Sequence, residues 1–197
     1  MEYREMLDSL IEQHEGLILT KDVTEAGIPR TYLSFLVKED ILERVAHGVY
    51  LTKDAFDDEM YSLQARSSRL IYSHETALYL HDLTDRDPLQ WVGTVPSGYN
   101  STNLKNEGVK VYTVKKELHQ LGVTNGQTEF GRKITLYDKE RTICDIIRSR
   151  NKMDSDLINE TIRRYVGRKD KNIPLLLRYA DQFRVHKVLR NYLEILL

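Results

Sequence analysis

The segment GIPRTYLSFLVKEDILERVAHGVYL, residues 27–51, carries the clearest structural pattern in the chain. Pro29 has the fixed φ angle that suits the first position of a helix. Leu33, Leu36 and Val37 follow at helical spacing, so one face of this helix is apolar and is expected to face a core. The pattern therefore predicts a helix that begins at the proline and ends about ten residues later.

A β-hairpin is expected directly after this helix. Residues 41–45 and 49–51 alternate apolar and polar side chains, as short strands do. The run Ala46-His47-Gly48 between them contains the glycine that a tight turn favours. The pattern predicts two antiparallel strands joined by this turn.

Two further helices are expected before this segment. Apolar residues recur at helical spacing over residues 2–14, and Gly16 suits the C-cap of such a helix. Thr20 is an acceptable N-cap for a second helix that ends at Gly27 after about two turns. Three helices followed by a hairpin are the outline of a winged helix-turn-helix, which the sequence predicts for residues 1–57.

This outline predicts DNA binding, because an α-helix fits the major groove, which is roughly 12 Å wide. Arg30 is the strongest candidate for reading a base, since it lies at the start of the third helix and a guanidinium can bond guanine O6 and N7 together. Other candidates lie on the outward side of that helix, at the start of the second helix, and on or beside the hairpin. They are Lys21, Thr31, Tyr32, Ser34, Lys38, Arg44, His47 and Lys53. Some winged helices bind only protein, so a protein-interaction module is an alternative.

The composition is typical of a soluble globular protein with one large or two small domains. The 197 residues include 29 Lys and Arg, 30 Asp and Glu, and one cysteine, so no internal disulfide is expected. No signal peptide or membrane span is expected, and the cytoplasm is the expected location. Residues 1–57 hold 6 basic and 12 acidic side chains, whereas residues 141–197 hold 13 and 7. An anionic partner is therefore expected at the C-terminal third or at a local basic patch of the first part.

Residues 58–197 are predicted to form a second domain of mixed α and β structure, with a sheet at about 70–137 and helices at about 138–197. A helix through Met60 is expected to bridge the two domains, and Ser73 is expected to cap a short helix. Strands are expected at 90–95, 109–114 and 132–137, with turns at 124–126 and at Gly131 before the last strand. Helices are expected to begin at Asp138 and at Asn172.

The basic residues of the C-terminal helices lie mostly between the apolar positions, which places them on the solvent side. Such a run is usually only a solvated face. After a DNA-binding module, the same residues are expected to add phosphate contacts along one duplex. The candidates are Arg148, Arg150, Arg163, Arg164 and Arg168.

Several runs together resemble one known family. They are ERVAHGVY at residues 43–50, SHETALYLHDLT at 73–84, VPSG at 95–98, and FG at 130–131 leading into YDKERTICD at 137–145. In this order and spacing they closely resemble the AbiEi family, which comprises abortive-infection antitoxins of bacterial type IV toxin-antitoxin systems. The run ERTICD is the most specific part of the resemblance.

The resemblance implies an antitoxin and repressor rather than an enzyme. Such proteins are encoded beside a nucleotidyltransferase-like toxin, protect against phage, and repress their own operon by binding inverted repeats in its promoter. It implies double-stranded DNA and a second copy of the chain on that DNA as partners. The second domain is expected to counter the toxin without a stable complex. No cofactor and no membrane partner are implied.

Four residues of the matching runs, Ser73, His74, Arg141 and Asp145, are candidates for the function of the second domain. Arg141 and Asp145 are four residues apart on one predicted helix and are expected to pair across a turn, as many helix-surface pairs do without any function. His74 is expected to form local hydrogen bonds rather than a metal site, because no HExxH motif or cysteine partner accompanies it.

A winged-helix nuclease that depends on a metal ion is the alternative function. Clustered carboxylates beside a lysine would bind Mg²⁺ and activate water, and Asp85, Asp87, Glu107 and Lys110 are available for that role. Glu107 and Lys110 are three residues apart at the entry to a strand, so their side chains need not share a face. The sequence therefore favours the repressor, with neither a catalytic residue nor a metal ligand.

Overall fold

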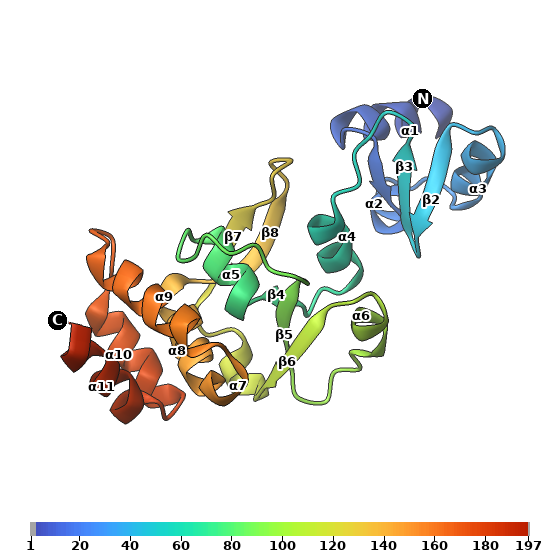
Figure 1. Ribbon diagram of the computed structural model, residues 1–197. Helices are drawn as coiled ribbons and strands as arrows, with labels where there is room; N and C mark the ends of the chain where they lie inside the picture. Colours follow the sequence, from blue (N-terminus) through green and yellow to red (C-terminus); the bar gives the residue numbers. More distant parts are fainter. Residues whose placement is uncertain (1–2, 197) are drawn as a thin grey trace. The chain divides into compact units, whose positions relative to one another are not determined.

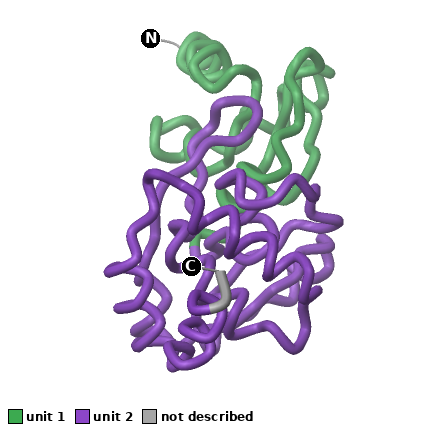
Figure 2. The backbone as a smooth tube through the Cα atoms, turned by 60° about the vertical axis from the view of Figure 1, so that its left-hand side comes forward, with its two compact units in different colours: residues 1–68 green, residues 69–197 purple. Residues whose placement is uncertain are grey.

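The protein folds as two compact units in the computed structural model, which describes residues 3–196 (Figure 1). Unit 1 covers residues 1–68 and unit 2 covers residues 69–197 (Figure 2). The units divide after residue 68 rather than at residue 57. The helix expected to bridge them belongs to unit 1, because its residues Tyr61 and Ala65 pack on the apolar side chains of that unit.

Unit 1 combines helices with a small antiparallel sheet. Its elements are α1 (Tyr3–Gln13), β1 (Leu17–Leu19), α2 (Thr20–Glu25), α3 (Thr31–Lys38), β2 (Leu42–Ala46), β3 (Val49–Thr52) and α4 (Glu59–Arg66). The three helices and the hairpin expected over the first fifty residues are confirmed, but α3 begins at Thr31, after the N-cap Arg30, and not at Pro29 as predicted. The sheet has the order β1-β3-β2. Strand β1 was not predicted, because three consecutive apolar residues are too short to show alternation.

Thr20 is the first residue of α2 and not its N-cap, contrary to the prediction. Leu19 holds the N-cap position with an extended backbone and without a capping side chain, because β1 runs directly into the helix. The Thr20 N–H donates to the Gly48 carbonyl at 2.9 Å. This bond ties the start of α2 to the turn of the hairpin.

One apolar cluster holds the helices of unit 1 together. Leu33 and Leu36 of α3 are fully buried in it, as predicted, whereas Val37 is 37 % exposed and does not belong to the inward face. Because these two leucines fix which side of α3 faces inward, Ser34 is left on the exposed side. The other buried members are Leu7, Ile18, Val23, Ile28 and Leu42.

Unit 2 contains a mixed sheet with the order β6-β5-β4-β8-β7. Strands β5 and β6 pair in parallel, as do β4 and β8, and the other neighbours are antiparallel. The predicted α+β character is confirmed. The elements are β4 (Ile71–Tyr72), α5 (His74–Leu80), β5 (Val92–Pro96), α6 (Thr102–Asn106), β6 (Lys110–Val114), α7 (Lys116–His119), β7 (Val123–Gln127), β8 (Lys133–Tyr137), α8 (Lys139–Arg148), a 3₁₀ turn (Arg150–Lys152), α9 (Ser155–Gly167), α10 (Ile173–Gln182) and α11 (His186–Leu196).

Residues 124–126 form part of a strand, not the predicted turn. They lie in β7, which pairs with β8 along its whole length. The ladder overrides the turn preference of Asn125 and Gly126. The chain reverses a few residues later, where the Gly131 N–H donates to the Thr128 carbonyl at 2.9 Å.

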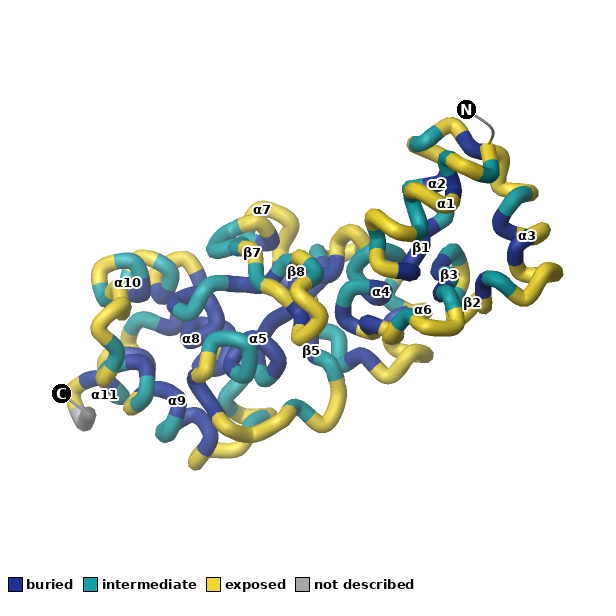
Figure 3. Tube along the Cα trace, turned by 90° about the horizontal axis from the view of Figure 1, so that it is seen from above, coloured by how far each residue is buried: buried dark blue, intermediate teal, exposed yellow. Residues whose placement is uncertain are grey.

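Helix α8 lies in the apolar core of unit 2, and every residue from Glu140 to Ile147 is buried. Figure 3 shows dense burial along α8 and the neighbouring α5. Helices α9, α10 and α11 contribute to the same core. Among the residues that the structure describes, no helix is long and apolar enough to cross a membrane.

Both predicted starts of helices in this layer are confirmed. The Asp138 carboxylate accepts from the Arg141 N–H at 2.7 Å at the start of α8. The Asn172 side chain accepts from the Leu175 N–H at 3.0 Å at the start of α10. These caps satisfy backbone donors that a helix leaves unpaired at its first turn.

Candidate functional site

An open groove of about 460 Å³ on unit 1 brings together residues from α2, α3, α4 and the hairpin. The residues predicted to contact DNA that line it are Lys21, Arg30, Ser34, Arg44 and His47. The tie between Thr20 and Gly48 places the start of α2 beside the hairpin turn, which is why these residues share one concavity.

Hydrogen bonds position the guanidinium of Arg30 on one side of the groove. Its Nε donates to Thr24 Oγ1 at 3.2 Å, and that hydroxyl donates to the Thr20 carbonyl at 2.8 Å. An arginine has five N–H donors in a fixed plane, so the terminal nitrogens still have donors to offer a base or a phosphate.

On the hairpin, a second arginine is held against the turn. Arg44 Nη2 lies 3.0 Å from His47 Nδ1, and Arg44 Nε donates to the Ala46 carbonyl at 3.4 Å. Because a guanidinium only donates, Nδ1 of His47 is the acceptor in this bond. The two side chains thus stiffen the turn that borders the groove.

The groove concentrates positive charge on an acidic unit. Residues 1–68 hold 7 Lys and Arg against 14 Asp and Glu, yet Lys21, Arg30, Arg44 and Arg66 all line the groove and no carboxylate does. In the part of the chain that the structure describes, the first three form no ion pair with a carboxylate. Their charge is therefore available to an anionic partner.

Arg66 was not predicted as a site residue. It ends α4, where its Nε donates to the Ser62 carbonyl at 3.1 Å. Its place beside the groove depends on the packing of Tyr61 and Ala65 against the sheet, which is a long-range contact that local periodicity does not reveal.

The remaining candidates of unit 1 lie outside the groove. Thr31 and Tyr32 line a separate depression with Arg4 and Phe35. Lys53 pairs with Asp40 on the surface. Lys38 lies exposed in the last turn of α3. These residues are therefore not brought together with Arg30.

The arginines predicted to contact DNA from unit 2 do not form one free basic face. Arg164 pairs with Asp85 and Glu160, and Arg168 pairs with Asp170. Arg148 and Arg150 each donate to a backbone carbonyl, of Thr113 and Ile147 respectively. Arg163 is exposed and has no ion pair in the described structure. The prediction of phosphate contacts by unit 2 therefore remains for Arg148, Arg150 and Arg163, which form no ion pair among the described residues.

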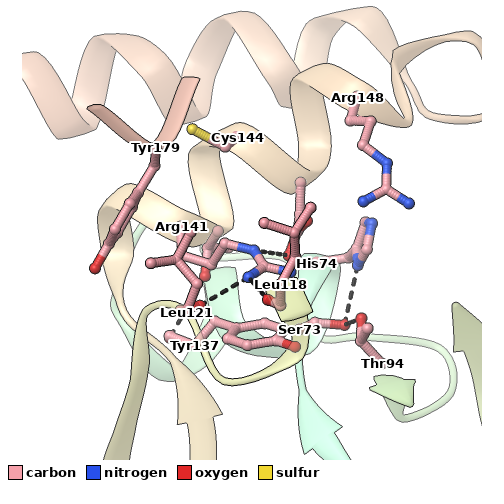
Figure 4. Close-up of polar contacts among 12 residues, drawn as sticks. Ser73, His74, Thr94, Leu118, Leu121, Tyr137, Arg141, Cys144, Arg148 and Tyr179 are labelled. Carbon is pink, nitrogen blue, oxygen red and sulfur yellow. Dashed lines mark hydrogen bonds and ion pairs between the residues drawn. The ribbon is translucent and has the colours of Figure 1, made fainter. Parts of the chain in front are cut away.

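Arg141 and Asp145 form a buried ion pair rather than a pair on the helix surface. Arg141 Nε lies 3.0 Å from Asp145 Oδ2, and the two side chains are 0 % and 3 % exposed. Arg141 Nη1 also donates to the carbonyls of Leu118 at 2.8 Å and Leu121 at 2.7 Å (Figure 4).

Aromatic rings surround the same guanidinium. Its carbon lies 4.0 Å from the centroid of the Tyr137 ring and 4.0 Å from that of the Phe183 ring. Burial raises the pKa of Asp145, and the adjacent Arg141 opposes that shift. The pair joins α8 to the sheet and to the loop after α7, so its role in this fold is to hold these elements together.

Ser73 and His74 lie in a second buried polar cluster. Ser73 holds the N-cap position of α5 but makes no capping bond with its side chain, contrary to the prediction. Its hydroxyl instead lies 2.8 Å from Thr94 Oγ1 on β5 and 3.0 Å from His74 Nδ1. Thr94 of the neighbouring strand, and not the backbone of α5, is thus a partner of the Ser73 hydroxyl.

The imidazole ring of His74 has contacts at both nitrogens and on one face. Its Nε2 lies 3.0 Å from Ser149 Oγ, and its ring stacks on Tyr112 with centroids 3.7 Å apart. Its φ angle of +50° is unusual for a residue other than glycine. Burial first, and then the charge of Arg148, lower the pKa of His74 well below its usual value of 6.5. The predicted local hydrogen bonds are confirmed, and the ring is neutral.

We expect the protein to lose stability as the pH falls from about 7.5 to about 5.5. The pKa values of His74, His81 and His119 are lowered in the folded protein, with burial as the first cause. Below their usual value the unfolded chain binds protons that the folded protein does not, so each histidine lowers the free energy of unfolding by up to about 1.4 kcal/mol per pH unit. Thermal unfolding at the two pH values measures this loss.

The His74→Asn variant is expected to lose less stability than the wild type over the same change of pH, because asparagine does not titrate. Asparagine also tolerates the left-handed backbone at this position. Asp138 and Asp145 have raised pKa values and act in the opposite sense. The difference between this variant and the wild type therefore isolates the histidine, and equal losses for the two proteins would contradict its assignment.

Of the four residues of the nuclease alternative, Asp87 and Lys110 line one pocket, whereas Asp85 and Glu107 do not line it. Asp85 pairs with Arg164, and Lys110 pairs with Glu75 at 2.8 Å rather than with Glu107. Within residues 3–196 the structure contains no group of three or more His, Cys, Asp and Glu side chains that could hold a metal ion.

One family of known proteins matches a segment of unit 1. Residues 5–53 match a family model that is described as a transcriptional regulator, AbiEi antitoxin. This confirms the predicted resemblance to the AbiEi antitoxins, over a segment that runs from α1 through β3 and includes the five predicted residues of the groove. No curated protein sequence matches the chain.

A solved structure is similar to more of the chain than that segment. The chain is similar to the crystal structure of the RV2827C protein from Mycobacterium tuberculosis, with a TM-score of 0.54. The two are 14% identical, and the similarity covers 98% of this chain and 80% of that one. At this level of identity the similarity shows a shared fold alone.

Proposed function

We propose that the protein is a bacterial antitoxin that also represses its own promoter, and that unit 1 is a winged helix-turn-helix which binds the operator through the basic groove. The groove is the observation that carries this proposal. It gathers cations from α2, α3, α4 and the hairpin on an otherwise acidic unit, and the family match covers all of these elements except α4.

The connection between α2 and α3 supports a helix-turn-helix. Gly27 has a φ angle of +74°, a left-handed conformation that glycine adopts without steric cost. The Ile28 N–H then donates to the Val23 carbonyl at 3.0 Å, which closes α2 before Pro29 directs the chain into α3. The turn presents Arg30 at the end of α3 that enters the major groove in such proteins.

The proposed roles differ along the groove. Arg30 reads a base, because its guanidinium is oriented by Thr24 and lies at the start of α3. Lys21 and Arg44 contact phosphates on either side, Lys21 from the start of α2 and Arg44 from the hairpin. Phosphate contacts set position and most of the salt dependence, whereas base contacts set sequence preference.

The rest of the proposal concerns the operon. Two copies of the chain bind inverted repeats in the promoter, and unit 2 counters a nucleotidyltransferase-like toxin without a stable complex, as in type IV systems that defend against phage. The resemblance of the residue runs in unit 2 supports this part. The cytoplasm is the proposed location.

The full-length Arg30→Ala variant separates the two activities. It is expected to lose repression of a reporter fused to the promoter while still rescuing cells that express the toxin. Loss of rescue at an unchanged level of protein would contradict a division of labour between the units.

Arg30→Ala is expected to weaken operator binding by about 1 to 3 kcal/mol, or roughly 5- to 150-fold, and to relax sequence preference. Mobility-shift titrations on the promoter duplex and on a random duplex of equal length measure both effects. Arg4→Ala is the matched control, because Arg4 is an arginine of the same unit outside the groove and pairs with Asp8. An unchanged ratio of operator to random affinity in Arg30→Ala would exclude base reading by Arg30.

A further inference from the structure

A second pocket lies on unit 2, and no residue used in the proposed function of unit 1 lines it. Its volume is about 460 Å³, which falls within the roughly 300 to 1,000 Å³ typical of sites for small molecules. It opens at the carboxyl ends of β5 and β6, where Ser97 and Lys115 follow the last residues of the two strands (Figure 1). Ligands of open α/β sheets bind at the carboxyl ends of parallel strands, and β5 and β6 are such a pair.

The polar lining of this pocket is predominantly cationic. Lys115, Arg148 and Arg184 line it together with one carboxylate, Glu117. Lys115 and Glu117 approach no closer than 4.0 Å, and both are largely exposed. Unit 2 as a whole holds 22 Lys and Arg against 16 Asp and Glu, so its field also favours an anion.

Arg148 is fixed in position before any ligand binds. Its Nη2 donates to the Thr113 carbonyl at 3.0 Å, and its guanidinium carbon lies 5.9 Å from the centroid of the Phe183 ring. Figure 4 shows the same guanidinium beside the His74 ring. In the described structure this arginine has no carboxylate partner. An oriented guanidinium with unused donors suits the oxygens of a phosphate group.

Arg184 occupies a backbone position that normally favours glycine. Its φ angle is +57°, and it follows the end of α10, where the Val185 N–H donates to the Ala180 carbonyl at 2.9 Å and the Arg184 N–H to the Asp181 carbonyl at 3.1 Å. These two bonds define a Schellman motif, whose left-handed residue is most often glycine. From this position Arg184 lines the pocket.

We infer that this pocket binds a small molecule that carries a phosphate group. The two arginines and Lys115 hold the phosphate, and the apolar wall of Val114, Leu118 and Phe183 receives the remainder of the molecule. The inference is independent of operator binding by unit 1.

Isothermal titration of the full-length protein with adenosine monophosphate, inorganic phosphate and adenosine tests the inference. Binding of the two phosphate-bearing probes, with no detectable binding of adenosine, is expected. Arg148→Gln is expected to weaken the binding of adenosine monophosphate about 10-fold or more, because a hydrogen bond to a charged group is lost. Absence of binding by both phosphate-bearing probes at millimolar concentration would overturn the inference.

Arg184→Gly separates a binding role from a structural one. Glycine relieves the left-handed backbone, so the melting temperature is expected to stay equal or rise, while the affinity for adenosine monophosphate falls about 10-fold. Asp82→Gly is the matched control, because Asp82 lies in the same motif after α5, with φ +56°, and does not line the pocket. It is expected to give the same thermal effect with undiminished affinity.

A duplex of random sequence distinguishes a free phosphate ligand from the backbone of DNA. If adenosine monophosphate fails to bind and Arg184→Gly weakens the random duplex instead, the pocket is a DNA contact and the inference is wrong. Equal affinity of the wild type and Arg184→Gly for adenosine monophosphate would also overturn it. Operator binding by unit 1 and phosphate binding by unit 2 are tested with different variants and different ligands. Failure of one proposal is therefore distinguishable from failure of the other.

Discussion

Arg141→Met is expected to destabilise the protein by about 3 to 5 kcal/mol, the largest effect of any single substitution considered for this chain. The variant leaves the Asp145 carboxylate buried without its partner and leaves the carbonyls of Leu118 and Leu121 without the donor they share. Urea unfolding followed by circular dichroism measures the free energy of unfolding. Unit 2 is expected to unfold first, because the pair lies in its core.

The double variant Arg141→Met with Asp145→Leu is the control for this interpretation. Replacing both members of a buried pair with apolar side chains of similar size is often neutral or stabilising, since no charge is left unpaired. The double variant is therefore expected to recover most of the lost stability. A double variant as unstable as Arg141→Met would show that the guanidinium acts mainly through the Leu118 and Leu121 carbonyls and the Tyr137 and Phe183 rings, and not through the carboxylate.

Lys21→Ala combined with Arg44→Ala is expected to weaken the operator and a random duplex alike, on the order of a hundredfold at low salt. The reason is that each side chain is proposed to contact a phosphate, and every contact releases bound counterions. The slope of log affinity against log salt is expected to become shallower by about 1.8, or about 0.9 per contact. Titrations at several salt concentrations measure the slope.

Lys38→Ala combined with Lys53→Ala removes the same charge from unit 1 outside the groove and serves as the control. Its slope is expected to change less than that of the groove variant. If the two double variants gave the same slope, net charge rather than the groove would govern binding. A loss of affinity for the operator alone would instead assign base contacts to Lys21 or Arg44.

Local patterns were sufficient to predict the elements of unit 1 that build the groove. Pro29, the apolar spacing of Leu33 and Leu36, and the glycine of the hairpin turn each act over a few residues, and the helices and strands follow them. Strand β1 escaped prediction because its pairing with β3 is formed by residues about thirty positions away.

Long-range contacts explain most of what the sequence did not reveal in the sites. Arg66 reaches the groove through the packing of α4, and Ser73 bonds to Thr94 on a neighbouring strand instead of capping its helix. The burial of the Arg141 and Asp145 pair also depended on elements distant in sequence, since α8 packs against α5 and α10. Residue spacing shows that two side chains can meet, but not whether solvent reaches them.

The enclosed positions of His74 and Arg141 change how genetic screens of this protein should be interpreted. A substitution at either residue lowers the share of folded molecules, and cells degrade the remainder by proteolysis. Under the proposed function, toxicity released by such a mutant then reports a reduced dose of antitoxin rather than a damaged contact surface. Measuring the abundance of each mutant beside its phenotype separates the two explanations.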